Sequence, residues 1–206
     1  MENSNWSQLS TDEVVQKTLD ALKERNIEAE VVEDKGATLK KIQTLIPDSA
    51  SVMTGASTTL DEIGFTDLLK SGSHPWKNFK DEMLAEKDEK LQNELRKRSV
   101  LADYYLGSVH AVTEGGKILI ASATGSQLPA SAFTSNHVIF VVGAQKIVKD
   151  FEGALRRLNE YVFPLEDARM KSVGYPGSVI GKILILEKEY VPGRIKLIFV
   201  KEKLGF

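Results

Sequence analysis

The stretch Val52-Met53-Thr54-Gly55-Ala56-Ser57-Thr58-Thr59 decides the fold. Its apolar first residues, Val52 and Met53, together with the preceding Ser51 predict a β-strand over Ser51 to Met53. The polar residues that follow contain a glycine and several hydroxyls and lead into a helix at Leu60. A strand that passes through such a loop directly into a helix is the building unit of a parallel sheet.

The residues before this unit repeat the same alternation. A hydroxyl and two acidic residues at the start predict a helix over Thr11 to Arg25. A strand over Ile27 to Glu33 follows, and then a helix that begins at Gly36 and is stopped by Pro47. Helices and strands therefore alternate, and this order predicts an α/β fold whose mainly parallel sheet is flanked by helices.

The middle of the chain differs in pattern. Phe79 to Arg98 is rich in charge and carries apolar residues at helical spacing, which predicts one long amphipathic helix inserted mid-chain. Further strands are expected at Ser108 to Val112, Lys117 to Ala121, Val138 to Val142, Lys182 to Leu186 and Ile195 to Val200. We find no linker or repeat, so residues 1–206 are expected to form one domain, with 1–26 as an N-terminal helical extension.

Composition excludes several classes of function. With 27 basic and 29 acidic side chains the formal net charge is −2, which argues against a general nucleic-acid binder. The chain has no cysteine, so it holds no thiolate metal site or iron–sulfur cluster of its own. The three histidines lack metal-ligand spacing, and we expect no metal and no cofactor. The amino terminus lacks secretory features, and the apolar runs fall short of the ~20 residues that span a bilayer, so no membrane contact and a cytoplasmic location are expected.

Two loops carry the main candidate binding residues. Each follows a predicted strand and places glycine and hydroxyl side chains at a predicted helix start, where backbone N–H groups attract a carboxylate or phosphate. If both strands belong to the parallel sheet, the loops share its ligand-binding edge. The alternative is that the hydroxyls only cap helices and the glycines only form turns. The candidate ligand-binding residues are Gly55, Ser57, Thr58, Gly125, Ser126 and Gln127.

Several further positions have both a functional and a structural interpretation. Lys146 follows the apolar strand Val138 to Val142 and is a candidate counter-charge for an anion, or else a surface lysine. Glu114, beside Gly115-Gly116, is a candidate catalytic base or nucleophile, or else a turn residue. Arg156, Arg157 and Arg169 suit a ligand clamp, a subunit interface or surface ion pairs, whereas His110 alternates with apolar neighbours and is expected to be a core or rim histidine.

The second half of the chain resembles the LUD-domain family (lactate utilization protein, LutC-like). The stretches that carry the resemblance are Leu106 to Gly116, Ala123 to Pro129, Val141 to Val148, Arg157 to Val162, Pro164 to Asp167, Pro192-Gly193-Arg194, Val200 to Phe206 and, upstream, Ser57 to Gly64. The resemblance implies a fold like that of the NagB, RpiA and CoA-transferase group. Thr54-Gly55-Ala56-Ser57-Thr58 is similar to the phosphate-holding loop of ribose-phosphate isomerases, apart from the alanine.

The resemblance also implies a setting in lactate oxidation, where partner proteins carry iron–sulfur clusters. The isomerases' aspartate-rich catalytic motif is missing here, and Glu114 alone matches the glutamate nucleophile of CoA-transferases, without its surrounding motif. Fold likeness therefore leaves the reaction open. Our first hypothesis is a site for a small anionic metabolite. The second is a non-catalytic regulatory or assembly subunit that docks an iron–sulfur protein or a second copy through Phe79 to Arg98 and the Arg156/Arg157 face.

Overall fold

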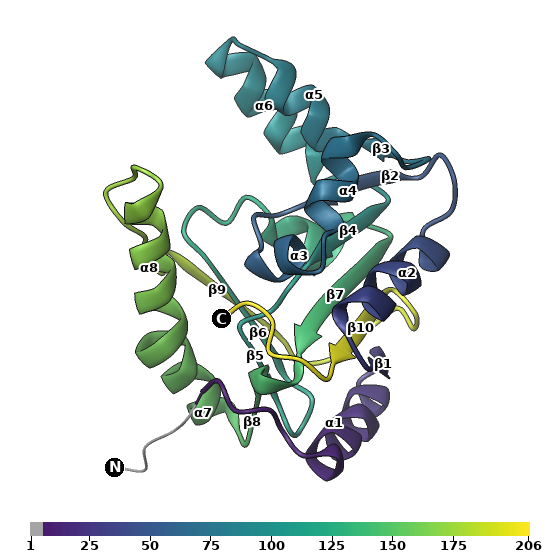
Figure 1. The fold of residues 1–206 in the computed structure, drawn as a ribbon, viewed down its shortest axis with the longest axis vertical. Helices are drawn as coiled ribbons and strands as arrows, with labels where there is room; N and C mark the ends of the chain where they lie inside the picture. Colours follow the sequence, from purple (N-terminus) through teal and green to yellow (C-terminus); the bar gives the residue numbers. More distant parts are fainter. Residues whose placement is uncertain (1–5) are drawn as a thin grey trace.

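Two β-sheets share the centre of the fold in the computed structural model, which describes residues 6–206 (Figure 1). The larger sheet has six strands, and all its pairs are parallel. Its order is β1 (Glu28–Val32), β10 (Ile195–Val200), β7 (His137–Gly143), β4 (Tyr104–Gly107), β2 (Ser51–Thr54) and β3 (Lys77–Asn78). The expected α/β fold with a mainly parallel sheet is confirmed.

The smaller sheet has four strands and packs beside the larger one. Its order is β8 (Ile147–Val148), β5 (Ala111–Thr113), β6 (Ile118–Ser122) and β9 (Lys182–Leu186). Strand β6 is antiparallel to both β5 and β9. The expectation that the loops after Met53 and after Ala121 leave the same parallel sheet is therefore wrong for the second loop. The short turn between β5 and β6 is the reason, because a connection of that length can join only antiparallel strands.

The alternation of side chains along β7 divides the core between two faces of the larger sheet. Val138, Phe140 and Val142 face helix α1 (Asp12–Glu24) and the smaller sheet. Ile139 and Val141 face the opposite layer, formed by helices α2 (Lys35–Leu45), α3 (Thr58–Glu62) and α4 (Phe65–Ser71). Helix α1, the expected N-terminal extension, contributes buried residues such as Leu22 to the first of these two layers.

A third apolar cluster lies on the far side of the smaller sheet. There helix α7 (Phe151–Arg157) continues through a π-helical turn, Leu158–Val162, into helix α8 (Phe163–Ser172). In Figure 1 this helical column stands apart from the parallel sheet, with the smaller sheet between them. The two sheets and the column therefore leave an opening on one side of the molecule, which the site described below occupies.

The expected long helix over Phe79 to Arg98 is two helices, α5 (Phe79–Ala85) and α6 (Glu89–Ser99). Glu86 accepts hydrogen bonds from the amides of Lys87 and Asp88, and the Asp88 carboxylate caps α6 through the Lys90 amide at 2.9 Å. These local acceptors compete with a continuous helix. The two helices form a hairpin that projects from the body of the molecule (Figure 1).

The predicted strand Ser108 to Val112 is only partly correct. Ala111–Thr113 forms β5 in the smaller sheet, whereas residues 108–110 cross between the sheets, and the strand before them, β4 (Tyr104–Gly107) of the larger sheet, was not predicted. The crossing is fixed at both ends, since Ser108 Oγ donates to the Val141 carbonyl at 2.7 Å and the His110 amide donates to Leu119 at 2.9 Å.

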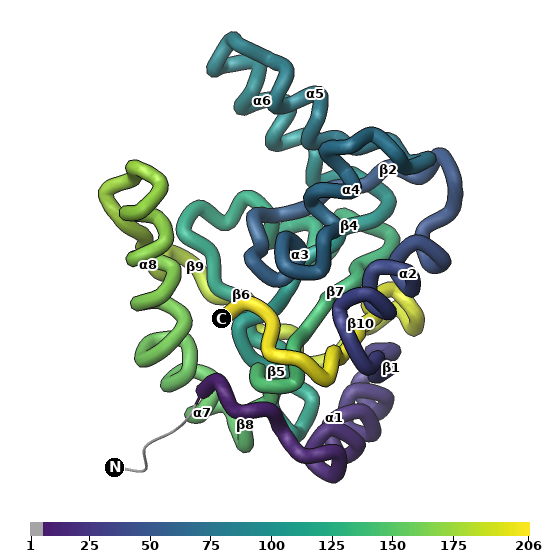
Figure 2. Tube along the Cα trace, in the orientation of Figure 1, coloured from purple at the N-terminus to yellow at the C-terminus, as the bar shows by residue number. Residues whose placement is uncertain are grey.

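The C-terminal segment turns back from β10 and ends close to α3 (Figure 2). The Gly205 amide donates to the Glu62 carboxylate at 2.6 Å, which ties the segment to that helix. Among residues 6–206, no helix is long and apolar enough to cross a membrane.

Candidate functional site

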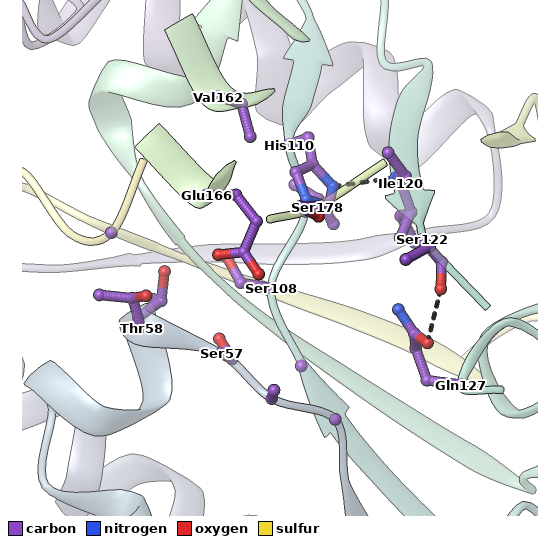
Figure 3. Close-up of a pocket in the computed structure, with 18 of the residues that line it drawn as sticks. Ser57, Thr58, Ser108, His110, Ile120, Ser122, Gln127, Val162, Glu166 and Ser178 are labelled. Carbon is purple, nitrogen blue, oxygen red and sulfur yellow. Dashed lines mark hydrogen bonds between the residues drawn. The ribbon is translucent and has the colours of Figure 1, made fainter. Parts of the chain in front are cut away.

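A cavity of about 440 Å³ lies at the carboxyl ends of three neighbouring parallel strands, β2, β4 and β7. The loop after β2 supplies Gly55 to Thr59, the crossing after β4 supplies Ser108 to His110, and the turn after β7 supplies Lys146. Strand β6, helix α8 and the α5–α6 hairpin complete its walls. Figure 3 shows side chains from these separate elements turned toward one space. This is the edge at which open parallel sheets bind ligands.

Most of the candidate ligand-binding residues meet in this cavity. Its lining includes Gly55, Ser57, Thr58, Ser126, Gln127 and Lys146. Gly125 is not part of the lining. It adopts the left-handed conformation with φ of +84°, and its amide donates to Ser122 Oγ at 2.9 Å, so it shapes the turn behind Ser126.

The hydroxyl groups of the two loops have two roles: some cap a helix, and others orient side chains toward the cavity. Ser57 Oγ accepts the Leu60 amide at 3.3 Å and caps α3, as the structural alternative expected. Ser122 Oγ donates to Gln127 Oε1 at 2.9 Å, which leaves the amide nitrogen of Gln127 turned toward the cavity (Figure 3). Ser57 and Gln127 therefore face each other across the cavity floor, each anchored by a local bond.

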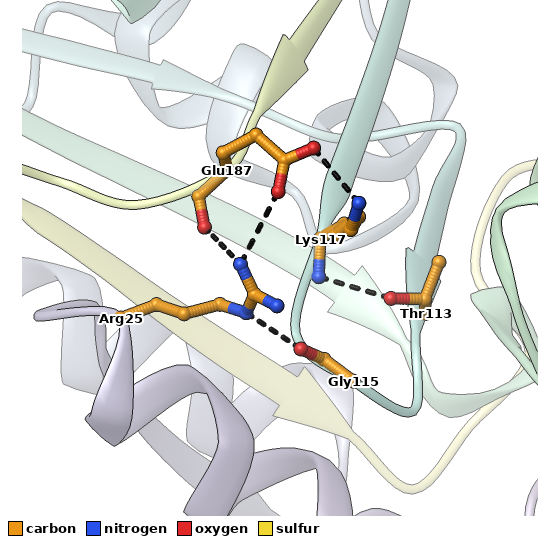
Figure 4. A network of polar contacts seen from close by, with 5 residues as sticks. All are labelled: Arg25, Thr113, Gly115, Lys117 and Glu187. Carbon is orange, nitrogen blue, oxygen red and sulfur yellow. Dashed lines mark hydrogen bonds and ion pairs between the residues drawn. The ribbon is translucent and has the colours of Figure 1, made fainter.

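Glu114 lies outside the cavity, in the turn between β5 and β6. Its carboxylate pairs with Lys17 of α1 at 2.8 Å, and its amide donates to the Val148 carbonyl. Figure 4 shows the same turn bound on its other side, where Arg25 donates to the Gly115 carbonyl at 2.6 Å and Lys117 pairs with Glu187 at 2.9 Å. These contacts connect α1, the turn and the end of β9, and they keep Glu114 apart from Lys146.

Lys146 is almost fully buried, with 2% of its surface exposed. Its Nζ donates to Thr59 Oγ1 and to Ser108 Oγ, both at 3.0 Å. Each hydroxyl directs its own proton elsewhere, Ser108 to the Val141 carbonyl at 2.7 Å and Thr59 to the Leu204 carbonyl at 3.4 Å. Both hydroxyls therefore act as acceptors toward the lysine. Among the described residues, no carboxylate forms an ion pair with Lys146.

Burial and, to a smaller extent, the positive charge of Arg157 lower the pKa of Lys146 to about 7, while Glu62 acts in the opposite direction. Removal from water penalises the ammonium form, and no paired anion compensates for it. At neutral pH the side chain is therefore divided between an ammonium ion and a neutral amine. The alternative interpretation of Lys146 as a surface lysine is wrong, because the turn after β7 folds inward beneath α3.

His110 lines the cavity, whereas its sequence pattern predicts a residue of the core or its rim. Its Nδ1 accepts the Ala121 amide at 3.0 Å, an arrangement that assigns the ring proton to Nε2 (Figure 3). Burial lowers the pKa of His110 to about 3, with further contributions from Lys146 and Arg157. The ring is thus neutral and lines the cavity as a fixed hydrogen-bond donor. The alternation of His110 with apolar neighbours in the sequence did not indicate that its ring lines a cavity.

Arg156 and Arg157 lie in different environments. Arg156 lies at the surface and pairs with Glu160 at 3.2 Å. Arg157 is fully buried, and its guanidinium donates to the His110 carbonyl and lies 5.3 Å from the ring centre of Tyr161. The expected Arg156/Arg157 docking face is therefore wrong, because Arg157 points behind the cavity wall.

Positive charge exceeds negative charge around the cavity. The outer lining contributes Lys80 and Arg96 from the hairpin and Arg169 from α8. Glu166 is the only acidic side chain among the described residues of the lining, and it is paired with Arg169 at 2.7 Å. No group of three His, Asp or Glu side chains within residues 6–206 is arranged to hold a metal ion. The lining therefore carries a surplus of positive charge.

The fold and the site define a class of protein: an α/β protein with a cationic cavity at the carboxyl ends of its parallel strands. The sequence matches the model of the LUD domain over residues 15–200, and the chain belongs to the LUD-domain family. It is similar to a DUF162 family protein from Deinococcus radiodurans, at 14% identity and a TM-score of 0.58, with 94% of this chain and 99% of that chain covered.

Two further solved structures match with lower TM-scores. Ribose 5-phosphate isomerase A from Methanocaldococcus jannaschii is 11% identical, with a TM-score of 0.39 and coverage of 82% of this chain and 96% of that one. The eIF2B beta subunit from Chaetomium thermophilum is 14% identical, with a TM-score of 0.39 and coverage of 68% and 48%. No curated protein matched the sequence.

Proposed function

We propose that the cavity binds a small organic anion, a carboxylate or a phosphate, with Lys146 as its buried counter-charge. One observation carries the proposal: a cationic side chain is buried at the cavity floor and has no carboxylate partner among the described residues. A buried charge is costly unless it is paired. A bound anion would supply the missing partner, so its binding would favour the ammonium form and raise the pKa of Lys146.

The surroundings of Lys146 suit such a ligand. The loop Gly55 to Thr58 and the amide of Gln127 offer hydrogen-bond donors, and Arg96 and Arg169 add positive charge at the mouth. A volume of about 440 Å³ lies within the usual range of roughly 300–1,000 Å³ for ligand pockets. Together with membership of the LUD-domain family, these features support an organic acid of cytoplasmic lactate or organic-acid metabolism as the ligand.

Calorimetry and thermal unfolding test the proposal. Lactate, pyruvate, sugar phosphates and nucleotides are titrated into the wild-type protein and into two variants, Lys146→Met and Lys149→Met. Lys149 is the matched control because it is exposed and three residues away. A ligand at about 100 times its Kd adds roughly 2.7 kcal/mol to the free energy of unfolding. We expect binding to be lost in Lys146→Met and retained in Lys149→Met; equal affinity in both variants contradicts the proposal.

A second candidate function, a non-catalytic regulatory or assembly subunit, draws on the projecting hairpin. Leu84 and Leu91 on α5 and α6 are 65% and 55% exposed. Apolar side chains on an arm that projects from the fold suit contact with a protein, and we propose an iron–sulfur protein of a lactate-oxidising system or a second copy of the chain.

Sedimentation velocity distinguishes these partners. The protein is measured alone and mixed with the iron–sulfur subunits of such a system. A complex that is lost in the double variant Leu84→Gln/Leu91→Gln supports docking through the hairpin. The control is Leu101→Gln, which changes a leucine of 65% exposure outside the hairpin. A single species of monomer mass under every condition rejects this candidate.

A further inference from the structure

We propose that Lys146 forms a covalent imine with a carbonyl compound that also carries an anionic group, the 2-oxo acids being the simplest class. This inference rests on the proposed function, since the anionic group must first bind in the same cavity. It adds a second role for Lys146: the ammonium form is the counter-charge of an anion, whereas the neutral amine is the nucleophile, and Arg96 and Arg169 of the lining remain as cations for the anionic group.

The hydrogen bonds of Lys146 Nζ match those of a neutral amine. A neutral amine has two hydrogens and one lone pair, whereas an ammonium ion has three hydrogens and none. The structure provides two acceptors, Thr59 Oγ1 and Ser108 Oγ, each at 3.0 Å. Because both hydroxyls donate their own protons to backbone carbonyls, neither can donate to the nitrogen. Both N–H groups of the neutral amine are thus satisfied, and its lone pair is left for a ligand.

The surroundings of Lys146 favour the same form. Burial and the charge of Arg157 disfavour the ammonium ion, with Glu62 as the opposing carboxylate and His110 as a neutral neighbour. A buried lysine near another cation is an activated nucleophile for this reason. Lys80, the other lysine of the cavity, is held on the hairpin and is only partly buried.

The reaction balances without an oxidant or a further reactant. The Lys146 nitrogen attacks the carbonyl carbon, its lone pair forms the C–N bond, and the carbonyl π electrons move to oxygen. One amine proton passes to that oxygen to give the carbinolamine. The C–O bond then breaks, and the oxygen leaves as water with the second amine proton while the C=N bond forms. The Nε2–H of neutral His110 is a hydrogen-bond donor on the cavity wall for the oxygen as it gains charge.

Reductive trapping tests the inference on the intact protein. Wild-type protein is incubated with pyruvate, 2-oxobutyrate or 2-oxoglutarate and then treated with borohydride, which adds hydride to the imine carbon. The expected product is heavier than the protein by the mass of the oxo acid less one oxygen atom. Peptide mapping should place at least ten times more adduct on Lys146 than on Lys80 or Lys149.

Two variants separate this inference from the proposed function. Lys146→Arg keeps a cation but cannot form an imine, so it should bind the oxo acid in calorimetry and give no mapped adduct at position 146. Lys149→Met should be trapped as the wild type is. Calorimetric binding by the wild type without adduct on Lys146 overturns the imine and leaves the anion site standing. Absence of both binding and adduct overturns both proposals, and adduct spread evenly over surface lysines overturns the imine.

Discussion

The buried guanidinium of Arg157 donates a hydrogen bond to the backbone carbonyl of His110. This contact joins the helical column behind the smaller sheet to the crossing segment that forms the cavity wall. It also places a permanent positive charge next to two titratable cavity residues, His110 and Lys146, whose pKa values it lowers. The electrostatics of the cavity are therefore set in part by a residue that does not line it.

Replacing Arg157 by leucine should raise the pKa of both His110 and Lys146, because the like charge that disfavours their protonated forms is removed. An NMR titration of the His110 ring measures the first shift directly. Arg156→Leu is the control, since that side chain lies at the surface and pairs with Glu160. Unchanged His110 titration in Arg157→Leu contradicts the role assigned to this charge.

The pH dependence of stability should carry the signature of Lys146. Its folded-state pKa of about 7 lies below its ordinary value of 10.5, so between these values the unfolded chain binds the extra proton. The free energy of unfolding should therefore rise with pH over this window, by at most ~1.4 kcal/mol per pH unit from this residue.

Lys146→Met should lose this contribution, and below pH 7 it should be the more stable protein because it buries no ammonium ion. Urea denaturation at pH 6, 8 and 10 gives the comparison, with Lys149→Met as the matched control. Parallel curves for wild type and Lys146→Met would show that Lys146 keeps an ordinary pKa in the folded protein.

His110 should govern part of the response to acid. Its folded-state pKa of about 3 lies below the ordinary value of 6.5, so the unfolded chain binds more protons between these values. Stability should fall as pH falls through this window. In His110→Asn the side-chain oxygen can still accept the Ala121 amide, and the variant should be less sensitive to pH between 6 and 4. The His110 signal is identified as the histidine signal that is present in the NMR spectrum of the wild type and absent from that of His110→Asn. Titration of this signal near pH 6.5 would contradict the lowered pKa of His110.

Gly205 should tolerate no side chain. Its φ is +59°, and an added Cβ would lie 2.5 Å from Thr59 Oγ1 and 3.3 Å from Lys146 Nζ. Gly174 is the matched control, with φ of +90° and nothing within 4 Å of an added Cβ. Gly174→Ala should cost only the left-handed backbone strain, about 1–2 kcal/mol.

Gly205→Ala should lower the free energy of unfolding by more than Gly174→Ala does. The variant should also weaken anion binding, because the terminal segment must move away from Thr59 or push against it. Urea denaturation and calorimetry on the two variants measure both effects. Equal losses of stability in Gly205→Ala and Gly174→Ala would show that the C-terminal segment shifts without disturbing the cavity.

Local patterns in the sequence were sufficient for four of the six strands of the larger sheet (β1, β2, β7 and β10) and for much of the site. Strand β7 is a continuous apolar run and β2 leads through glycine into a capped helix, and each of these features is determined by residues close in sequence. Because the carboxyl ends of parallel strands share an edge, the sequence pattern alone predicts that the loop Gly55 to Thr58 and Lys146 lie together.

The remaining features depend on contacts between distant residues. Ser108 to His110 form no regular strand because residues 33 and 9 positions further along, Val141 and Leu119, hold the two ends of the crossing. The hairpin of α5 and α6 is an exception, because it depends on local caps at Glu86 and Asp88, which the helical spacing of the apolar residues does not indicate.

The sequence by itself determined that an apolar strand ends near Lys146, since periodicity and apolar runs are local properties of the chain. Only the tertiary structure decided that this lysine is buried against Thr59 and Ser108 without a carboxylate partner among the described residues. Burial and pairing are sums over neighbours from remote segments, and these neighbours set whether a lysine is a surface ammonium ion or an amine within a cavity.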